Sequence, residues 1–528
     1  YWGNVAEGFN GELMLEAPSS IAAPETVSVT DGVATGSLEI REDGVHRVSV
    51  SKPDEDLATM TNPLRTDSTD PGLYWGDIHG QSGETVGTGT VWDYFAFGRD
   101  RAFLDFAAHA GNDFQIDETF WTEIKEAVDE YNEPGEFVTF PCYEWSANTP
   151  NGGDHNVYFN GGDPELRHSS SWLIEDQDDF ARHEGVFPVK KLYEHYENRD
   201  DVLIIPHQGG RPATLDVFES DLSPFLELVS VWGVFEWFGH EALDQGYPIG
   251  FVGGSDDHTG RPGATSPANK ADFTIDGGLM AAQTDTLDRD GLWDAFTDRR
   301  VYATTGARII LETSIASASM GQATTTDGAV EADVSVHGTA PLERIDLFRG
   351  SQRVATQDLG DGDDRVTVTW SGSKGRVRHK TLDWSGGLTI DDGRIRSATD
   401  AGFDHPNSGI QQVTDTAVRW LGETAGNYQA IHMNVDAPPG TEVVLSTEPA
   451  NGRFQLAALD DGPVVIADRP HCQAIARRTA QATDPDATIQ LRDPDPPTGE
   501  QAYYIRVRQA DGEMAWSSPS FVTVTDSN

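Results

Sequence analysis

The sequence predicts a central α/β region flanked by two β-rich modules. Between about residues 69 and 310, short apolar runs alternate with segments of helical period, which is typical of β/α units. Residues 1–68 and 311–528 instead carry short alternating runs separated by turn residues. At 528 residues the chain is too long for one simple core. These three ranges are therefore the predicted domains.

The N-terminal range predicts an immunoglobulin-like β module, complete or partial, followed by a linker. Alternating runs at residues 36–40 and 45–50 are separated by Asp-Gly turns, which often join paired strands. Residues 52–71 are rich in Pro, Asp, Ser and Thr. We expect that segment to connect the module to the central region.

The central range predicts strands near residues 103–108, 137–140, 202–205, 226–231 and 249–252. The clearest helix spans about 118–132, where Asp117 can cap its start and Pro134-Gly135 stop it. A second helix is expected near 287–296. Strands that alternate with helices imply parallel pairing, and these are numerous enough for a barrel or a barrel-like sheet.

The C-terminal range predicts an all-β module of sandwich type. Its apolar runs, such as those at 331–336, 344–348 and 503–508, are short and largely alternating. Asp-Gly, Gly-Ser and Pro-rich turns divide them. Frequent turns between short strands are the usual pattern of such folds.

The composition excludes several classes of function. With 37 Lys+Arg against 87 Asp+Glu, the formal charge is −50, which disfavours nucleic-acid and anionic-lipid partners. No apolar stretch approaches membrane-spanning length. Two distant cysteines make neither a disulfide framework nor a thiolate metal site. The acidic surface and flanking β modules suggest a periplasmic or extracellular protein from a halophilic or marine source, or a merely acidic secreted protein.

Chemistry-bearing side chains collect where the central strands end. Parallel β/α folds place their sites at the carboxyl ends of strands, so these ends are expected to converge. Mixed nitrogen and oxygen donors suit zinc, manganese or iron. Any single residue here is more often structural than a ligand, but the repetition favours a metal site. The candidates are Asp77, His79, Gln81, His109, Asp113, Glu144, His155, His207, Asp256 and His258.

Other histidines are expected to lie outside this site. His168, His183 and His195 sit in polar loop or helical surroundings and are predicted to be solvated. The histidines of the β modules have no ligand-like spacing.

Three of these strand ends resemble a known superfamily. The segments Gly-Asp-Ile-His-Gly-Gln at 76–81, Ile-Pro-His-Gln-Gly at 205–209 and Gly-Ser-Asp-Asp-His at 254–258 resemble motifs of the PHP (polymerase and histidinol phosphatase) superfamily. The chain is more closely similar to an uncharacterised PHP-like family of unknown function, DUF3604. The resemblance covers most of the chain, including the Thr-Thr-Gly-Ala-Arg segment at 304–308.

The resemblance implies a distorted β/α barrel with two or three divalent metals that hydrolyses phosphate esters. Carried over by motif, Glu144 would be a bridging carboxylate. The implied ligands also include His79, His155, His207, Asp256 and His258.

The chain departs from the superfamily pattern in three places. Gln81 replaces the second histidine of the usual His-x-His motif, and an amide oxygen is a weaker ligand. The usual Thr-Asp-His is replaced by residues 109–113, so that His109, Asp113 or both could supply a ligand. Glu236 and His240 are candidates for the ligand that often follows the fifth strand.

The leading functional prediction is hydrolysis of a phosphate mono- or diester by metal-activated water, with a small-molecule or polymeric anionic substrate. Asp77 and Glu144 would act at the reacting centre, and Arg211 or Arg261 could bind the anion unless each forms an ordinary salt bridge. One alternative is a sulfate-ester or other hydrolase on the same metal site. Another is a non-catalytic extracellular binding protein with a degenerate barrel. The oligomeric state is left open.

Overall fold

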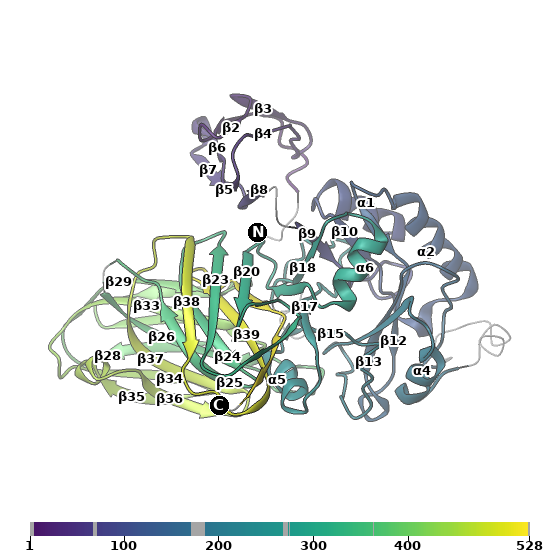
Figure 1. Ribbon diagram of the computed structural model, residues 1–528. Coiled ribbons are helices and arrows are strands. Elements are labelled where there is room, and N and C mark those ends of the chain that lie inside the picture. Colours follow the sequence, from purple (N-terminus) through teal and green to yellow (C-terminus); the bar gives the residue numbers. More distant parts are fainter. Residues whose placement is uncertain are drawn as a thin grey trace.

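The computed structural model describes residues 5–66, 71–170, 185–267, 273, 275–362 and 364–525. Figure 1 shows a small N-terminal β module, a central region that carries the α-helices, and a large C-terminal β module. The mixed character predicted from the sequence is confirmed, although strands dominate. His183 lies outside the described residues.

The N-terminal module is built from short antiparallel strands. Its sheets contain β3 (Thr26–Val29), β1 (Gly11–Glu16), β6 (Ser49–Lys52) and β7 (Leu57–Met60), then the pairs β2 (Ile21–Ala22) with β4 (Glu39–Ile40) and β5 (Gly44–His46) with β8 (Leu64–Thr66). The linker predicted at 52–71 was wrong in part, because β7 and β8 lie in it and pair with earlier strands. Short alternating runs can pair even among Pro and Asp.

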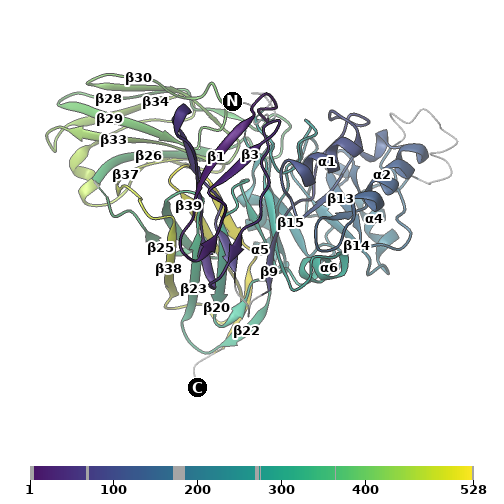
Figure 2. The ribbon, with the colours of Figure 1, turned by 90° about the horizontal axis from the view of Figure 1, so that it is seen from above.

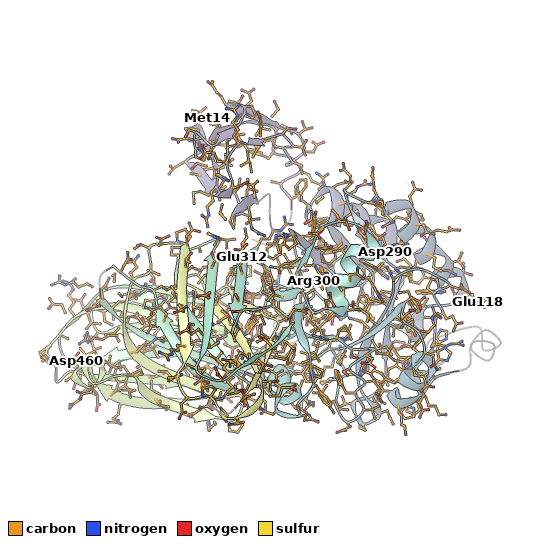
Figure 3. All side chains as sticks on the ribbon, viewed as in Figure 1. Met14, Glu118, Asp290, Arg300, Glu312 and Asp460 are labelled. Atoms are coloured by element: carbon orange, nitrogen blue, oxygen red, sulfur yellow. The ribbon has the colours of Figure 1, made fainter. Side chains whose placement is uncertain are left out.

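Ion pairs attach the N-terminal module to the C-terminal module. Arg47 lies 2.9 Å from Asp486, and Arg65 lies 2.7 Å from Glu312. Figure 3 labels Glu312 on the face below the N-terminal module. Both arginine side chains are largely buried, so these pairs hold the module against its neighbour.

The helices of the central region begin at identifiable caps. Asp117 accepts a hydrogen bond from the Phe120 amide at 2.8 Å, as predicted, and Thr90 and Asp93 form a capping box. Figures 1 and 2 place α1, α2 and α4 on the side away from the C-terminal module. The α-helices are α1 (Val91–Asp100), α2 (Glu118–Tyr131), α4 (Val189–Tyr196), α5 (Glu236–Asp244) and α6 (Arg289–Thr297).

The central strands form separate sheets, and the predicted barrel is not confirmed. Strands β9 (Gly72–Asp77), β10 (Phe106–Ala108) and β11 (Val138–Phe140) pair in parallel, as do β15 (Phe225–Ser230) and β17 (Gly250–Gly253). By contrast, β12 (Cys142–Ser146), β13 (Asp154–Phe159) and β14 (Val202–Pro206) are antiparallel. The short β16 (Gly233–Val234) pairs with β15. Too few residues separate β12 from β13 for a helical crossover, so parallel pairing fails there.

Isolated bridges nevertheless bring the strand ends together. Gly80, just after β9, pairs with Asp257, just after β17. Asn112, beyond β10, pairs with Glu144 of β12 in the same way. The strand ends therefore converge as predicted, which is the feature that positions the site.

One sheet runs from the central region into the C-terminal module. Strand β18 (Leu279–Thr284) lies antiparallel to β9, and β19 (Val301–Thr304) pairs with β40 (Met514–Ser517). The sheet continues through β39 (Gly499–Gln509), β24 (Leu342–Arg349) and β25 (Gln352–Asp358), with β22 (Ala323–Thr326) and β41 (Ser520–Val524) beside it. The boundary predicted at residue 310 is therefore not a boundary of this sheet.

The rest of the C-terminal module is all-β, as predicted. A four-stranded sheet holds β21 (Ala318–Ser319), β20 (Ile310–Ile315), β23 (Val330–His337) and β38 (Asp486–Asp493). One five-stranded sheet holds β29 (Arg394–Ala401), β33 (Tyr428–Asp436), β26 (Asp364–Gly372), β37 (Cys472–Ala480) and β36 (Val464–Arg469). The other holds β30 (Gly409–Val413), β31 (Ala417–Leu421), β28 (Gly386–Ile390), β34 (Glu442–Thr447) and β35 (Asn451–Gln455), and β27 (Leu382–Asp383) pairs with β32 (Glu423–Thr424).

Stacked tryptophans mark the core that the two five-stranded sheets share. The ring of Trp370 lies 5.0 Å from that of Trp420 and 5.8 Å from that of Trp384, and all three are buried. Cys142 and Cys472 are buried free thiols in different modules. The sandwich geometry stays a prediction.

Candidate metal centre

Six buried side chains from the converging strand ends form one cluster, which we call the metal-site cluster. They make up three groups, and within each group the ligand atoms lie within 4.8 Å of one another. The groups are His79 with His207 and Glu227, His79 with Glu144 and Asp256, and Glu144 with Asp154 and His207. Because the groups share members, the cluster is one continuous site.

His79 and His207 lie at the centre of the cluster. Their ring centroids are 4.4 Å apart and nearly perpendicular. His79 Nδ1 lies 2.9 Å from Glu227 Oε2, and its Nε2 lies 3.4 Å from Asp256 Oδ1. His207 Nε2 lies 3.4 Å from Glu144 Oε1. Each imidazole therefore faces carboxylate oxygens in the buried interior.

Several polar atoms of the cluster have no hydrogen-bond partner among the described residues. These atoms are His79 Nε2, both ring nitrogens of His207, and Glu227 Oε1. Buried polar atoms are costly unless they are paired, so unpaired nitrogen and oxygen atoms that converge are those of a binding site. Imidazole nitrogens and carboxylate oxygens suit zinc, manganese or iron. The donor set therefore fits a divalent metal.

The electrostatics of the cluster favour a cation at its centre. Burial alone would lower the pKa of His79, but Asp256 and Glu227 raise it to about 10. Burial lowers the pKa of His207 to about 4, and the charge of His79 acts in the same direction. Burial raises the pKa of Asp154 to about 6, although Arg211 opposes the shift. The carboxylates thus hold a proton on His79, and a divalent cation could replace that positive charge.

Asp77 fastens the strand ends and does not face the cluster. Its carboxylate accepts hydrogen bonds from the backbone N–H groups of Ser255 at 2.9 Å, Gly263 at 2.8 Å and His79 at 3.2 Å. Burial raises its pKa to about 6. These bonds join the segment after β9 to the segment after β17, so the observed contacts are those of a positioning residue.

Gln81 orients a ligand candidate. Its side-chain N–H groups donate to Glu144 Oε2 at 2.8 Å and to the Ala110 carbonyl at 2.9 Å. Its amide oxygen accepts a hydrogen bond from Thr85 at 2.7 Å. Gln81 therefore orients Glu144, and both its amide nitrogen and its amide oxygen form hydrogen bonds within the protein.

Neither His109 nor Asp113 belongs to the three metal groups. His109 Nε2 lies 2.9 Å from the Ser82 hydroxyl, and Asp113 accepts hydrogen bonds from the Ser146 amide at 2.7 Å and the Ser169 hydroxyl at 2.9 Å. The neighbouring Asn112 contacts the cluster instead, donating to Glu144.

His155 faces away from the cluster, whereas Asp154 faces into it. Successive side chains of a strand point to opposite faces, and both residues lie on β13. His155 packs against the rings of Trp145 and Tyr193. The sequence favoured the imidazole on chemical grounds, and the strand places the carboxylate at the site.

Asp256 and His258 do lie together, as predicted. His258 Nε2 is 3.1 Å from Asp256 Oδ1, and Trp232 Nε1 donates to Asp256 Oδ2 at 2.6 Å. His258 does not belong to the three groups, and it contacts the cluster through Asp256. Asp257 accepts from Thr259 and the Arg261 amide and so closes the following turn.

The two arginines differ in their contacts. Arg211 Nε lies 2.7 Å from Asp154 Oδ1, and its Nη2 lies 3.7 Å from Glu144 Oε1. Burial would lower the pKa of Arg211, but Asp154 and Glu144 raise it, so it remains charged at the cluster. Arg261 donates from Nε to the Thr259 hydroxyl at 3.2 Å, within its own turn.

Glu236 and His240 lie outside the metal-site cluster. Glu236 pairs with Arg506 at 2.7 Å, and His240 lies 2.8 Å from the Tyr504 hydroxyl. Both lie on α5, which follows β16 and contacts the C-terminal module. His168 was predicted wrongly, since it is fully buried beside the Ile116 carbonyl, while His195 is partly exposed and pairs with Glu165.

The sequence prediction missed two cluster members, Asp154 and Glu227, and Glu227 carried a signal in the sequence. It is the single acidic residue in the otherwise apolar β15 and is 1% exposed. Acidic side chains are rarely buried unless they are paired. A lone carboxylate inside a strand expected to be buried was therefore the signal.

The described features define a β-rich protein with a buried His/Asp/Glu cluster suited to divalent metal. Residues 93–211 match the model of a family described as "Protein of unknown function (DUF3604)". The resemblance to the DUF3604 family is thereby confirmed in that segment, which contains Glu144, Asp154 and His207.

Uncharacterized proteins of three Chlamydia species are similar to this chain. The protein of Chlamydia pneumoniae is 24% identical over 62% of this chain and 56% of its own length. Those of Chlamydia muridarum and Chlamydia trachomatis serovar D are each 23% identical over the same shares. The match thus spans just over half the length of these relatives.

A solved structure from Bacteroides vulgatus is also similar. It is described as a two-domain protein containing a predicted PHP-like metal-dependent phosphoesterase, with a TM-score of 0.32 and 9% identity over 82% of this chain and 98% of the other. At that TM-score, the function of this chain has to be argued from its own residues. No helix among the described residues is long and apolar enough to cross a membrane.

Proposed function

We propose that this protein is a metal-dependent hydrolase that acts on phosphate esters. The observation that carries the proposal is the set of unpartnered buried atoms on His79, His207 and Glu227, which face one another in one cluster. Imidazole nitrogens and carboxylate oxygens that converge within 4.8 Å in each group are the donor set of a metal-binding site, where a bound ion would satisfy them.

Each member of the cluster has a role in this proposal. The imidazoles of His79 and His207 and the carboxylates of Glu227, Asp256, Glu144 and Asp154 would hold one or more divalent ions. Such ions, when bound, supply Lewis-acid activation of water and of an ester oxygen. Gln81 and Asn112 orient Glu144 by donating to the same oxygen, Oε2, which leaves Oε1 facing His207.

Arg211 would bind the anionic part of the substrate. Its guanidinium group contacts two members of the cluster, Asp154 and Glu144, and about a quarter of its side chain is exposed. A guanidinium group binds phosphate oxygens in a bidentate manner, and in a buried site the charge is poorly screened. Its bonds to Asp154 also hold it in one orientation.

A panel of aryl esters tests the proposal. Purified protein is loaded separately with zinc, manganese or iron(II) and assayed on phosphate monoesters, phosphate diesters and sulfate esters. We expect turnover of a phosphate ester that disappears with chelator and in the Asp256→Asn variant. Turnover of sulfate esters alone would show that the substrates are sulfate esters and not phosphate esters. Metal-loaded protein that turns over no ester would contradict the hydrolase proposal.

A further inference from the structure

A dense basic segment stands out in this acidic chain. Residues 374–380 read Lys-Gly-Arg-Val-Arg-His-Lys, although acidic residues outnumber Lys and Arg by 87 to 37 overall. The segment, called the basic loop below, follows β26 in the C-terminal module. The function proposed above leaves it without a role.

The basic loop is fastened to the metal site at two points. Lys380 is 2% exposed and donates from Nζ to the Gly209 carbonyl at 2.7 Å. Arg376 donates from Nε to the Ala213 carbonyl at 3.1 Å and from Nη2 to Glu241 at 2.6 Å. Gly209 and Ala213 belong to the turn that follows His207, so the C-terminal module braces the segment that carries a ligand candidate.

Arg378 lies between these two anchors and is exposed. Its guanidinium carbon is 5.2 Å from the centre of the Trp232 ring, and Trp232 Nε1 donates to Asp256 at 2.6 Å. Arg378 is therefore one aromatic ring away from the metal-site cluster.

The turn at Gly209 and Gly210 lies close both to the metal-site cluster and to Arg378. A methyl group on Gly209 would lie 3.1 Å from Asp154 Oδ2, whereas one on Gly210 would lie 2.9 Å from Arg378 Nη1. Consecutive Cα atoms are about 3.8 Å apart. Neighbouring residues of this one turn therefore lie beside Asp154 of the cluster and beside the Arg378 guanidinium.

We propose that Arg378 is a specificity-determining residue that binds the anionic group of the substrate at the mouth of the metal site. The inference rests on the function proposed above and extends it, because it assigns substrate recognition to the C-terminal module. A formal charge of −50 repels anions over most of the surface, so a local cluster of cations is needed to attract them. An arginine fork stacked on an aromatic ring provides it in a fixed orientation.

Calorimetric titration with inorganic phosphate tests the inference. Wild type and Arg378→Gln are compared with and without bound metal, and sulfate is titrated in parallel. Because the variant loses a charged hydrogen bond to the anion, we expect it to bind phosphate at least about tenfold more weakly, a change of about 1.4 kcal/mol. Metal content and melting temperature should be unchanged, and KM for an anionic ester should rise while kcat stays nearly constant.

Two further variants make the result specific. Arg394→Gln removes an exposed arginine at the start of β29 that pairs with Asp415 in the turn between β30 and β31, and it should leave phosphate binding unchanged. Arg378→Lys keeps the charge without the fork and should retain part of the affinity. It also serves if Arg378→Gln fails to fold.

Three results would distinguish the inference from the proposed function. Equal phosphate affinity in wild type and Arg378→Gln would overturn the role of Arg378. Absence of phosphate binding by metal-loaded wild type would overturn it as well. A variant with weakened phosphate binding, in a protein that hydrolyses no ester, would support the anion site and contradict only the hydrolase.

Discussion

Replacing Glu227 by glutamine should weaken metal binding. Glu227 Oε2 lies 2.9 Å from His79 Nδ1, and Oε1 has no hydrogen-bond partner among the described residues. The substitution keeps the size of the side chain and removes its charge. Loss of the carboxylate partner of a metal-binding histidine costs about 10–100-fold in affinity, which corresponds to about 1.4–2.8 kcal/mol. If Glu227 is itself a ligand, the loss should reach the upper end of that range.

Competition against a chromophoric chelator measures this loss for zinc and for manganese. Glu442→Gln is the matched control, since Glu442 is partly exposed and pairs with Arg453 in the C-terminal module. Circular dichroism establishes that both variants fold. Metal affinity that is unchanged in Glu227→Gln would refute the assignment of Glu227 to the site.

Three other predictions concern stability. Glu343 is buried and lies 2.9 Å from Arg508, and although burial would raise its pKa, Arg508 and Arg477 lower it to about 2. The stabilisation of the fold by ionised Glu343 should be present above about pH 4.5 and lost as pH falls toward 2. Glu343→Gln should lower the free energy of unfolding at pH 7, measured by urea denaturation, by roughly 3 kcal/mol. A change near zero would contradict this prediction. Thr90→Ala should cost about 1 kcal/mol through loss of the helix cap, whereas Thr90→Ser should cost little in the same assay. Because the net charge is −50, the melting temperature should rise between low and high NaCl concentration, and a flat profile would argue against self-repulsion.

Local features of the fold were predictable from the sequence. The start of α2 follows from Asp117 and its amphipathic period, and residues 202–205 lie within β14. The convergence of strand ends followed from the general geometry of β/α folds. The start of α2 and the position of β14 depend on neighbouring residues, which a sequence pattern shows directly, whereas the convergence rests on a general rule of the fold class.

Pairings between distant segments could not be predicted. Nothing local to residues 301–304 shows that they pair with residues 515–517 and so extend one sheet into the C-terminal module. Likewise, the antiparallel order of β12, β13 and β14 decides that Asp154 faces the site and His155 does not. A shift of one residue along a strand exchanges the two faces, so the choice between neighbours needs the three-dimensional register.

Metal content tests the central claim most directly. Protein purified without chelator, and the same protein after incubation with zinc, manganese or iron(II), is analysed by mass spectrometry beside a Glu144→Ala/His207→Ala double variant. We predict stoichiometric divalent metal in the wild type and its loss in the folded double variant. Wild-type protein that stays free of metal after incubation with all of these ions would contradict the account.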